Sequence, residues 1–255
     1  MLIYPLLTLF LYIDGMKKQT VGVALAFVGL GLVGVVAVGG LLGMNSNTKE
    51  LASEVPDPSD FLSMGPQITS LPRQDISENE KEGLLFMREE EKLARDVYTT
   101  LYEKWGLPIF TNISQSEQSH TEAVRVVLIK YDIEDPVTDE TSGKFANTDL
   151  ATLYINLLAE GQRSELDALK VGAYIEDLDI KDLQTRIAQT DNDDIRLVYQ
   201  NLMKGSRNHL RAFVSQIESR GGVYVPRYIS KEEFDVIVSS PRETGTVGGS
   251  RAGRQ

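Results

Sequence analysis

A glutamate and a histidine three residues apart, Glu117 and His120, constrain the fold of this chain more than any other feature of its sequence. On a helix this spacing brings both side chains to one face, with Cβ atoms about 5–6 Å apart. A Glu-x-x-His pair on one helix and a glutamate on a neighbouring helix are the ligand pattern of carboxylate-bridged metal sites inside four-helix bundles. The run Glu89–Glu91 supplies such a glutamate upstream. The chain has two histidines, His120 and His209, and both fall in stretches that we expect to be helical.

Apolar residues recur at helical spacing over four long stretches, which we expect to form helices. They cover about residues 77–105, 114–131, 164–189 and 195–220. The stretches form two closely spaced pairs, and residues 132–163 between the pairs are a long connection with a short helix near 149–159. Two helical hairpins joined by one long crossover are the ferritin-like topology among four-helix bundles. The sequence therefore predicts an all-α, ferritin-like four-helix bundle with one long crossover.

Glu117, near the boundary between the first two helices, and Glu91, within the first helix, each have two possible roles. Gly106 and Pro108 are expected to end the first helix. Ser114 is expected to begin the second, and Ser114 and Glu117 have the spacing of a capping box, so Glu117 is either a ligand or a capping partner. Glu91 in turn is either a ligand or part of a solvated charge run.

A long apolar segment near the N-terminus predicts where the protein is located. Val21–Met44 is an uninterrupted run of 24 apolar or glycine residues, long enough to span a bilayer. Lys17 and Lys18 precede it, and no basic residue follows before Lys49, so the positive-inside rule places the body of the protein outside the cytoplasm. A cleaved signal peptide is the alternative. We expect a membrane-anchored protein with an extracytoplasmic domain, or a secreted one.

The sequence divides into four parts. Residues 1–44 are the membrane anchor or signal segment. Residues 45–76 are polar, contain four prolines and lack helical periodicity, which predicts a flexible linker. Residues 77–237 are the predicted helical domain, including a short apolar tail that folds back on it. Residues 238–255 are rich in glycine, serine and arginine and are predicted to be disordered.

Composition excludes several classes of function. The formal net charge is −11, and because residues 1–44 carry +1, residues 45–255 carry −12. So acidic a body argues against DNA or RNA as a partner, since phosphate binding needs clustered lysine and arginine. The chain has no cysteine, which excludes disulfides, zinc–thiolate sites, iron–sulfur clusters and a cysteine nucleophile.

Four segments carry a resemblance to a known family. The first helix resembles that of rubrerythrin-type ferritin-like proteins through Glu91, Ala94, Arg95 and Tyr98. Over about residues 77–237 the chain resembles more closely a ferritin-like domain family of prokaryotes whose function is unknown. The segments that carry this resemblance are Phe86–Tyr98, Ser116–His120, Ala168–Ile180 and Gly205–Phe213.

The resemblance implies metal ligands at five positions and a gap at a sixth. The five are Glu91, Glu117, His120, Glu176 and His209. The sixth ligand of the ferritin-like pattern, a glutamate three residues before His209, is missing because Ser206 stands there. Three carboxylates would leave a pair of divalent ions with unbalanced charge in a core of low dielectric constant, so we expect one tight metal and at best a weak second.

Helix geometry tests this ligand set. Glu176 and His209 lie at matching heights above the turn between their helices. Glu91 and Glu117 meet only if residues 106–113 run back along the bundle in extended form, and Glu103 would match Glu117 without that detour. If these residues do not bind metal, both histidines are hydrogen-bonded core residues and Glu176 lies on the surface.

The sequence supports two functions from different classes. The first is a metal-binding domain, because carboxylate and imidazole ligands suit iron or manganese. The resemblance implies oxygen or peroxide chemistry, as a metal-dependent oxidoreductase, or metal handling. The second is a metal-free helical interaction or stress-response module with no catalytic activity. The expected partners are a metal ion and the membrane, with a homo-oligomer left open and no nucleic acid.

Overall fold

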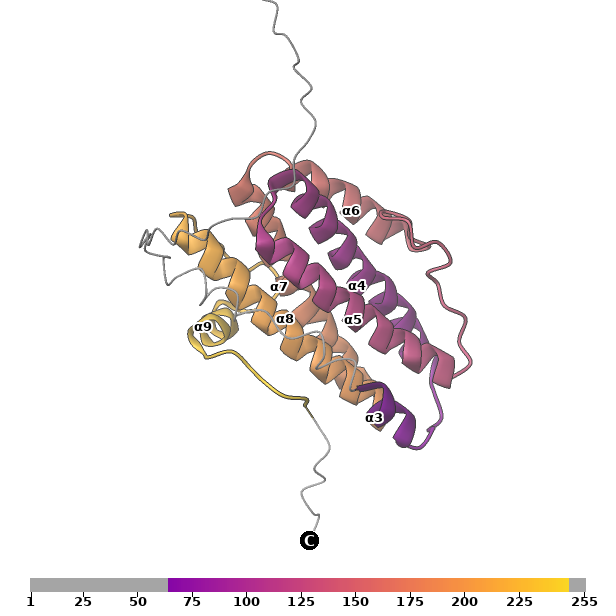
Figure 1. Cartoon of the computed structure of the whole chain (residues 1–255). Coiled ribbons are helices and arrows are strands. Elements are labelled where there is room, and N and C mark those ends of the chain that lie inside the picture. Colours follow the sequence, from indigo (N-terminus) through magenta and orange to yellow (C-terminus); the bar gives the residue numbers. More distant parts are fainter. Residues whose placement is uncertain (1–63, 248–255) are drawn as a thin grey trace, which may run out of the picture. The chain divides into compact units, whose positions relative to one another are not determined.

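The structure is a computed structural model that describes residues 64–247, and this part of the chain is entirely helical (Figure 1). The all-α prediction is thereby confirmed for the described residues, which contain seven helices and no strand. The helices are α3 (Met64–Ser70), α4 (Glu78–Trp105), α5 (Pro108–Lys130), α6 (Thr148–Gly161), α7 (Glu165–Gln189), α8 (Asp193–Ser219) and α9 (Lys231–Ser239).

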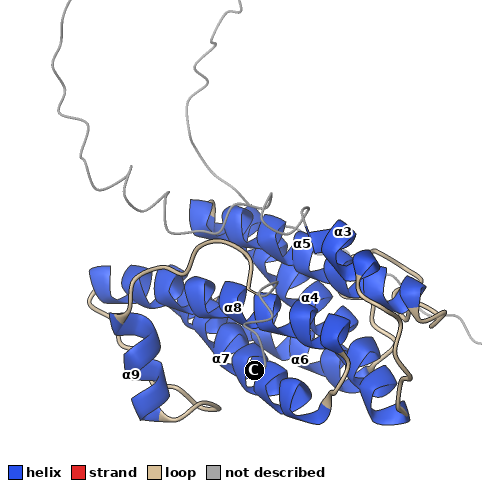
Figure 2. Ribbon diagram, turned by 90° about the horizontal axis from the view of Figure 1, so that it is seen from below, coloured by secondary structure: helices blue, strands red, loops and turns tan. Residues whose placement is uncertain are grey.

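The four long helices pair as two hairpins that pack against each other. Helix α4 packs along α5, and α7 packs along α8, while α4 also contacts α7 and α5 contacts α8. The connection between the hairpins carries α6, which lies against α4 and α7. Figures 1 and 2 show α6 and α9 on the outside of the four long helices. Helix α9 is the apolar tail that was expected to fold back, and it packs on α8.

The apolar core is divided into two clusters along the helices. One contains Leu93, Val97 and Leu101 of α4 together with apolar residues of α5, α6, α7, α8 and α9. The other contains Leu84 and Met87 of α4 with residues of α3, α5, α7 and α8. Between them, residues 88–92 of α4 are all charged and all buried. A polar layer therefore crosses the interior between two apolar ones.

The ends of α4 agree with the sequence, but the start of α5 does not. Ser77 and Glu80 form a capping box at the start of α4. Gly106 ends this helix in the left-handed region with φ +65°. Helix α5 begins at Pro108 and not at Ser114, because proline is well suited to the first turn of a helix, where its missing N–H is not needed. The expected extended detour over residues 106–113 is wrong.

The tryptophan at the end of α4 joins the first hairpin to the crossover. The indole N–H of Trp105 donates to the backbone oxygen of Gly161, the last residue of α6, at 2.9 Å. Lys104 donates to the backbone oxygen of the next residue, Gln162, at 2.6 Å. The C-terminal ends of α4 and α6 are thus held together.

The linker predicted over residues 45–76 is wrong for its last part. Helix α3 lies in this range, and its Met64 and Ile68 are fully buried against α5 and α8. The Nζ atom of Lys130, the last residue of α5, donates to the backbone oxygens of Ile68 and Leu71 at 2.9 Å each. The sequence hid this helix because two apolar residues four apart, interrupted by Pro66, are too few to show a period.

The disorder predicted from residue 238 onward is also wrong for residues 238–247. Val238 and Ser239 belong to α9, and the chain that follows runs along α8. Glu243 accepts hydrogen bonds from Arg207 at 2.8 Å and from Arg211 at 3.0 Å. Val247 donates its N–H to the side chain of Asn201 at 2.8 Å. Polar contacts with α8 therefore order a segment that has no apolar pattern.

The predicted membrane segment lies outside the described residues. No helix among residues 64–247 has the length and apolar character of a membrane span. The run Val21–Met44 falls in the undescribed part, so its role as an anchor or signal stays a prediction.

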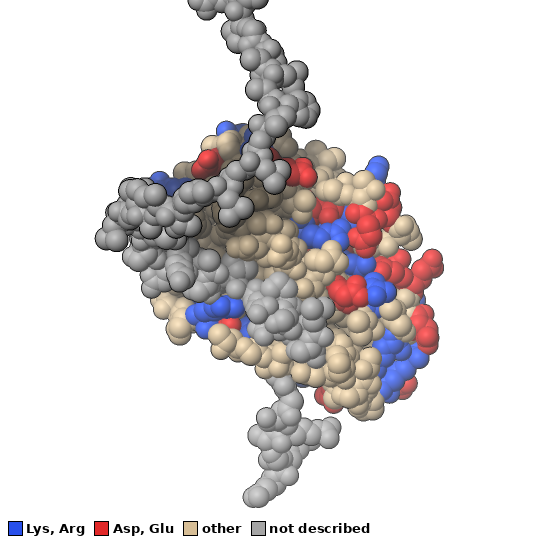
Figure 3. Space-filling model, in the orientation of Figure 1, with Lys and Arg blue, Asp and Glu red and all other residues tan. Residues whose placement is uncertain are grey.

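On the face seen in Figure 3, acidic and basic side chains are intermixed and do not form a basic patch.

Candidate metal centre

The polar layer inside the four long helices contains all five residues that were expected to bind metal. Glu91 comes from α4, Glu117 and His120 from α5, Glu176 from α7 and His209 from α8. Each is at most 2% exposed. They form two groups whose ligand atoms lie within 4.8 Å of one another, and Glu117 belongs to both.

The first group joins α4 and α5. The Nδ1 atom of His120 lies 2.6 Å from Oε2 of Glu117 and 3.1 Å from Oε2 of Glu91. The other Glu91 oxygen, Oε1, is buried without a hydrogen-bond partner among the described residues. A buried carboxylate oxygen that accepts no hydrogen bond is costly, and a cation would relieve that cost.

The second group joins α5, α7 and α8. The Nδ1 atom of His209 lies 2.8 Å from Oε1 of Glu117 and 3.4 Å from Oε2 of Glu176. Its Nε2 atom lies 3.0 Å from the hydroxyl oxygen of Ser116, which holds the ring in place. The two imidazole rings stack with centroids 5.5 Å apart and planes inclined by 24°. Glu117 thus presents one oxygen to each histidine and links the two groups.

Buried charge shifts the pKa of every member of these groups. Burial alone would lower the histidine pKa values, but Glu117 and Glu91 raise the pKa of His120 to about 9, and Glu117 and Glu176 raise that of His209 to about 10. Burial would raise the pKa of Glu117, yet the two histidines hold it well below its ordinary value. Burial raises the pKa of Glu91 to about 7 against the opposing effect of His120. In the metal-free layer, protonated histidines thus balance the carboxylates.

Three consecutive glutamates of α4 point in three directions. The Glu89 carboxylate accepts hydrogen bonds from the backbone N–H groups of Ala146 and Asn147, just before α6. Glu90 faces α7, because Asp182 lies within its hydrogen-bonding reach, and Glu91 faces His120. Successive helical residues are turned by about 100°, so one run serves three neighbours. The interpretation of Glu91 as part of a solvated charge run is therefore wrong.

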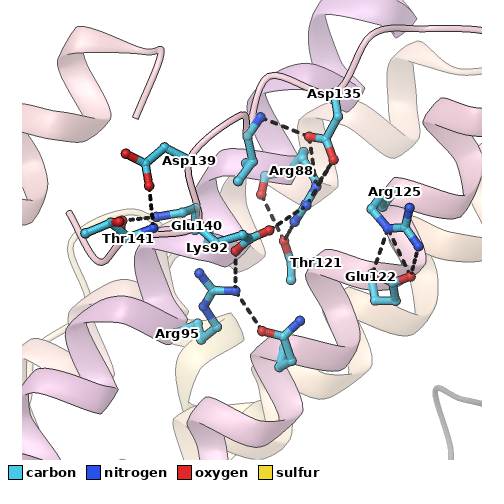
Figure 4. A network of polar contacts seen from close by, with 12 residues as sticks. Arg88, Lys92, Arg95, Thr121, Glu122, Arg125, Asp135, Asp139, Glu140 and Thr141 are labelled. Carbon is cyan, nitrogen blue, oxygen red and sulfur yellow. Dashed lines mark hydrogen bonds and ion pairs between the residues drawn. The ribbon is translucent and has the colours of Figure 1, made fainter. Parts of the chain in front are cut away.

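Basic residues of α4 hold the crossover loop between α5 and α6 in place. Figure 4 shows the side chains of Arg88, Lys92 and Arg95 meeting the loop between α5 and α6. Lys92, which is fully buried, donates to Asp96 at 2.6 Å and to the backbone oxygen of Thr141 at 3.0 Å. Arg88 pairs with Asp135 and also donates to Thr121, the residue after His120. These contacts fix the turn of α4 that carries Glu91.

Burial and helix boundaries exclude three alternatives that the sequence left open. Glu103 is exposed and is not part of the layer. The hydroxyl of Ser114 donates to the backbone oxygen of Thr111 inside α5, so Glu117 is not the partner of a capping box. Glu176 is buried, so it is not a surface residue.

Sequence reasoning missed two residues of the layer. Tyr98, expected only as core, donates its hydroxyl to Oε1 of Glu176 at 2.5 Å. Asp179 is buried one turn beyond Glu176 and accepts a hydrogen bond from Ser206, the residue that replaces the expected glutamate. Burial, together with Glu91 and Glu90, raises the pKa of Asp179 well above its ordinary value. The three-residue spacing between Glu176 and Asp179 was the available signal.

The donor set fits a hard or borderline divalent metal. Two imidazole nitrogens and three carboxylates suit iron, manganese or zinc, and the chain has no thiolate that would favour a softer ion. Tyr98 and Ser116 make hydrogen bonds to Glu176 and His209 of the kind that orient metal ligands in proteins.

Comparisons with known proteins agree on the extent of this domain. The chain is 60% identical over 178 residues to "Uncharacterized protein MJ0754" of Methanocaldococcus jannaschii, covering 70% of this chain and 96% of that protein. It is also similar to the crystal structure of hypothetical protein MJ0754 from Methanococcus jannaschii, with a TM-score of 0.68 and 60% identity, covering 68% of this chain and 99% of that one. Residues 80–241, more than half of the chain, match an uncharacterized protein domain known as DUF2202. The chain therefore belongs to the DUF2202 family.

Proposed function

We propose that this domain is a ferritin-like four-helix bundle that binds iron or manganese in its polar layer. The observation that carries the proposal is that Glu117 places one oxygen beside each of two buried histidines, while Glu91 and Glu176 complete a group on either side. Two such groups around one shared carboxylate match the carboxylate-bridged sites of ferritin-like bundles. Two hairpins joined by a long connection support the same assignment.

The chemistry we propose is oxygen or peroxide activation, or metal handling. Iron or manganese, if bound in the layer, would supply the redox capacity that such chemistry needs. The protein would hold the ion with Glu91, Glu117, His120, Glu176 and His209. Tyr98 fixes the orientation of Glu176 through its 2.5 Å hydrogen bond, and Ser116 fixes that of His209. The apolar clusters on both sides of the layer exclude water from it.

We further propose that the domain works outside the cytoplasm. The support is the run Val21–Met44 behind Lys17 and Lys18, with no basic residue following it before Lys49. The run acts as a membrane anchor or as a signal peptide.

One observation favours a second function, a metal-free interaction module. In the absence of metal, the raised pKa values of His120 and His209 supply two positive charges to the layer. Glu91, Glu117 and Glu176 then lie beside protonated histidines without any metal ion, which supports a bundle that acts as a structural unit.

Metal analysis separates the two functions. The full chain is purified in detergent, stripped with chelator and loaded with Mn²⁺ or, without oxygen, with Fe²⁺. We expect at least one tightly bound metal per chain. In Glu117→Gln the affinity should fall by about 100-fold or more, because both groups lose their shared ligand. The exposed Glu103→Gln, also on a bundle helix, is the matched control and should bind as the wild type does. Less than about 0.2 metal per wild-type chain would support the metal-free module.

A further inference from the structure

A carboxylate outside the two metal groups is buried without a donor. Glu90 is 3% exposed, and neither of its oxygens accepts a hydrogen bond from an N–H or O–H group among the described residues. Buried carboxylates normally receive such bonds, so an unpartnered one marks a place where a cation is missing or a proton is shared.

The neighbours of Glu90 are further carboxylates that lie in sequence from the surface to the metal groups. On the outer side, Asp182 of α7 is partly exposed and lies within hydrogen-bonding reach of Glu90. On the inner side, Asp179 is buried and close enough to interact electrostatically with Glu90, Glu91 and Glu176. Its Oδ1 atom has no hydrogen-bond partner among the described residues.

The other surroundings of the layer are less suited to a cation. Towards the crossover, the side chains of Arg88, Lys92 and Arg95 would repel it (Figure 4). Along the helices, one side is closed by the packed rings of Tyr98, Phe110 and Phe213, with centroids 5.3–6.1 Å apart. Between α4 and α7, in contrast, three carboxylates follow one another inward, and Arg186 and Lys181 offset them only in part.

We propose that Asp182, Glu90 and Asp179 form the access route by which a divalent cation passes between α4 and α7 to the metal centre. Glu90 is the transfer site, since this buried carboxylate neighbours both the partly exposed Asp182 and the inner Asp179. This inference rests on the proposed function, because a route for cations requires a centre that binds them. It adds residues that hold the ion during loading and release it afterwards.

The test compares the rate of loading with the final amount bound. The chelator-stripped full chain in detergent is mixed with Co²⁺ alone, and loading is followed by the visible absorption of bound Co²⁺ in stopped flow. Equilibrium dialysis gives the stoichiometry. The variants are Glu90→Gln, which keeps the size of the side chain, and Asp182→Asn at the partly exposed end. Asp167→Asn is the matched control, because it removes the same charge from a partly exposed position on α7, about 22 Å away along the helix.

We expect Glu90→Gln and Asp182→Asn to slow loading by about tenfold, the lower end of the effect of focused charge on association rates. The stoichiometry should stay that of the wild type, because both metal groups are intact. Asp167→Asn should change the rate by less than about twofold. Asp182→Glu should load at close to the wild-type rate, because it retains the negative charge at the outer end.

Two results would overturn the access route, and they are distinguishable. If the wild type binds Co²⁺ and both variants load at the wild-type rate, the route is wrong while the metal centre stands. If the wild type binds no Co²⁺, both the metal centre and the route are wrong. Should Glu90→Gln fail to fold, Asp182→Asn decides the question, because its side chain reaches the surface.

Discussion

At the scale of single residues, the proposed function implies that protons and metal compete for His120 and His209. Their pKa values of about 9 and 10 lie above the ordinary 6.5. Such groups stabilise the metal-free fold fully below pH 6.5, and this contribution is lost as the pH rises through 9 and 10. A histidine must be deprotonated to bind metal, so metal affinity changes in the opposite direction.

We therefore expect the metal-free protein to lose stability between about pH 7 and 10, while its affinity for Mn²⁺ rises over the same interval. Urea unfolding of the chelator-stripped chain measures the first, and calorimetric titration in several buffers measures the second together with the protons released. A metal affinity that stays constant between pH 7 and 9 would contradict the assignment of the histidines as ligands.

Asp179 changes the charge balance on which the sequence argument for a single tight metal was based. That argument counted three carboxylates, because Ser206 stands where a glutamate was expected. The structure adds Asp179, which accepts the hydrogen bond of Ser206. With Asp179 and the nearby Glu90, three carboxylates are no longer the whole negative charge around the two groups, so the charge argument for a weak second metal no longer holds. The stoichiometry itself is still a prediction to be measured.

A carboxylate swap tests the role of Asp179. Ser206→Glu alone places a second buried carboxylate beside Asp179 and should destabilise the metal-free chain by about 1–3 kcal/mol, because Asp179 also loses its donor. The double variant Asp179→Ser with Ser206→Glu moves the carboxylate from α7 to α8 and should recover most of that loss. Urea unfolding and metal stoichiometry of all three proteins give the answer. Equal stability of the single and double variants would show that removing Asp179 brings no relief, and would contradict the expected repulsion between the two carboxylates.

The residues that sequence could identify are those whose partners lie on the same helix or in a recognised motif. Glu117 and His120 share a helix face, and the resemblance supplied Glu91, Glu176 and His209. Glu90 was missed because its neighbours Asp182 and Asp179 lie on α7, and no spacing rule links α4 to α7. Asp179 was missed although its three-residue spacing from Glu176 on α7 was a signal. The three directions of Glu89, Glu90 and Glu91 likewise depend on packing between helices. The sequence alone therefore could not distinguish this buried glutamate run from a solvated helix face.

At the scale of helices, the sequence located the four long elements and misplaced one boundary, the start of α5. The start of α4 after Ser77 and its end before Gly106 agree with the structure, because these residues are local capping signals. The start of α5 was misplaced by six residues, since Pro108 is both a helix stop and a good first residue of the next helix. This error alone made Glu91 and Glu117 look too far apart.

Helix α3 gives a prediction at this scale. A fragment that begins at residue 77 lacks Met64 and Ile68, which are fully buried against α5 and α8. Burial of each side chain stabilises by about 1.5–3 kcal/mol, so fragment 77–247 should be less stable than fragment 64–247 by about 3 kcal/mol or more. Urea unfolding of both fragments measures the difference.

Point variants of fragment 64–247 control for the effect of chain length. Met64→Ala and Ile68→Ala should each destabilise it, whereas Thr69→Ala, on the exposed side of α3, should not. If fragments 64–247 and 77–247 unfold at the same urea concentration, α3 does not contribute to the folded domain.

At the scale of the whole molecule, the N-terminal run predicts a body outside the cytoplasm. Protease added to intact cells should cut within residues 45–63, because residues from Met64 onward are held in packed structure. A soluble fragment that begins near Met64 should then be released, and mass spectrometry of the supernatant identifies its first residue. Release only after the cells are lysed would show that the orientation is wrong.

Trp105 gives this molecule a reporter of its own. It is the single tryptophan of the chain, so its fluorescence comes from one place, the junction of α4 and α6. Fourteen residues of helix separate it from Glu91, or about 21 Å, which is too far for direct contact with a bound ion. Its emission should therefore change little when metal binds and strongly when the crossover helix detaches. An unlabelled sample can thus distinguish loss of metal from loss of structure in a single titration.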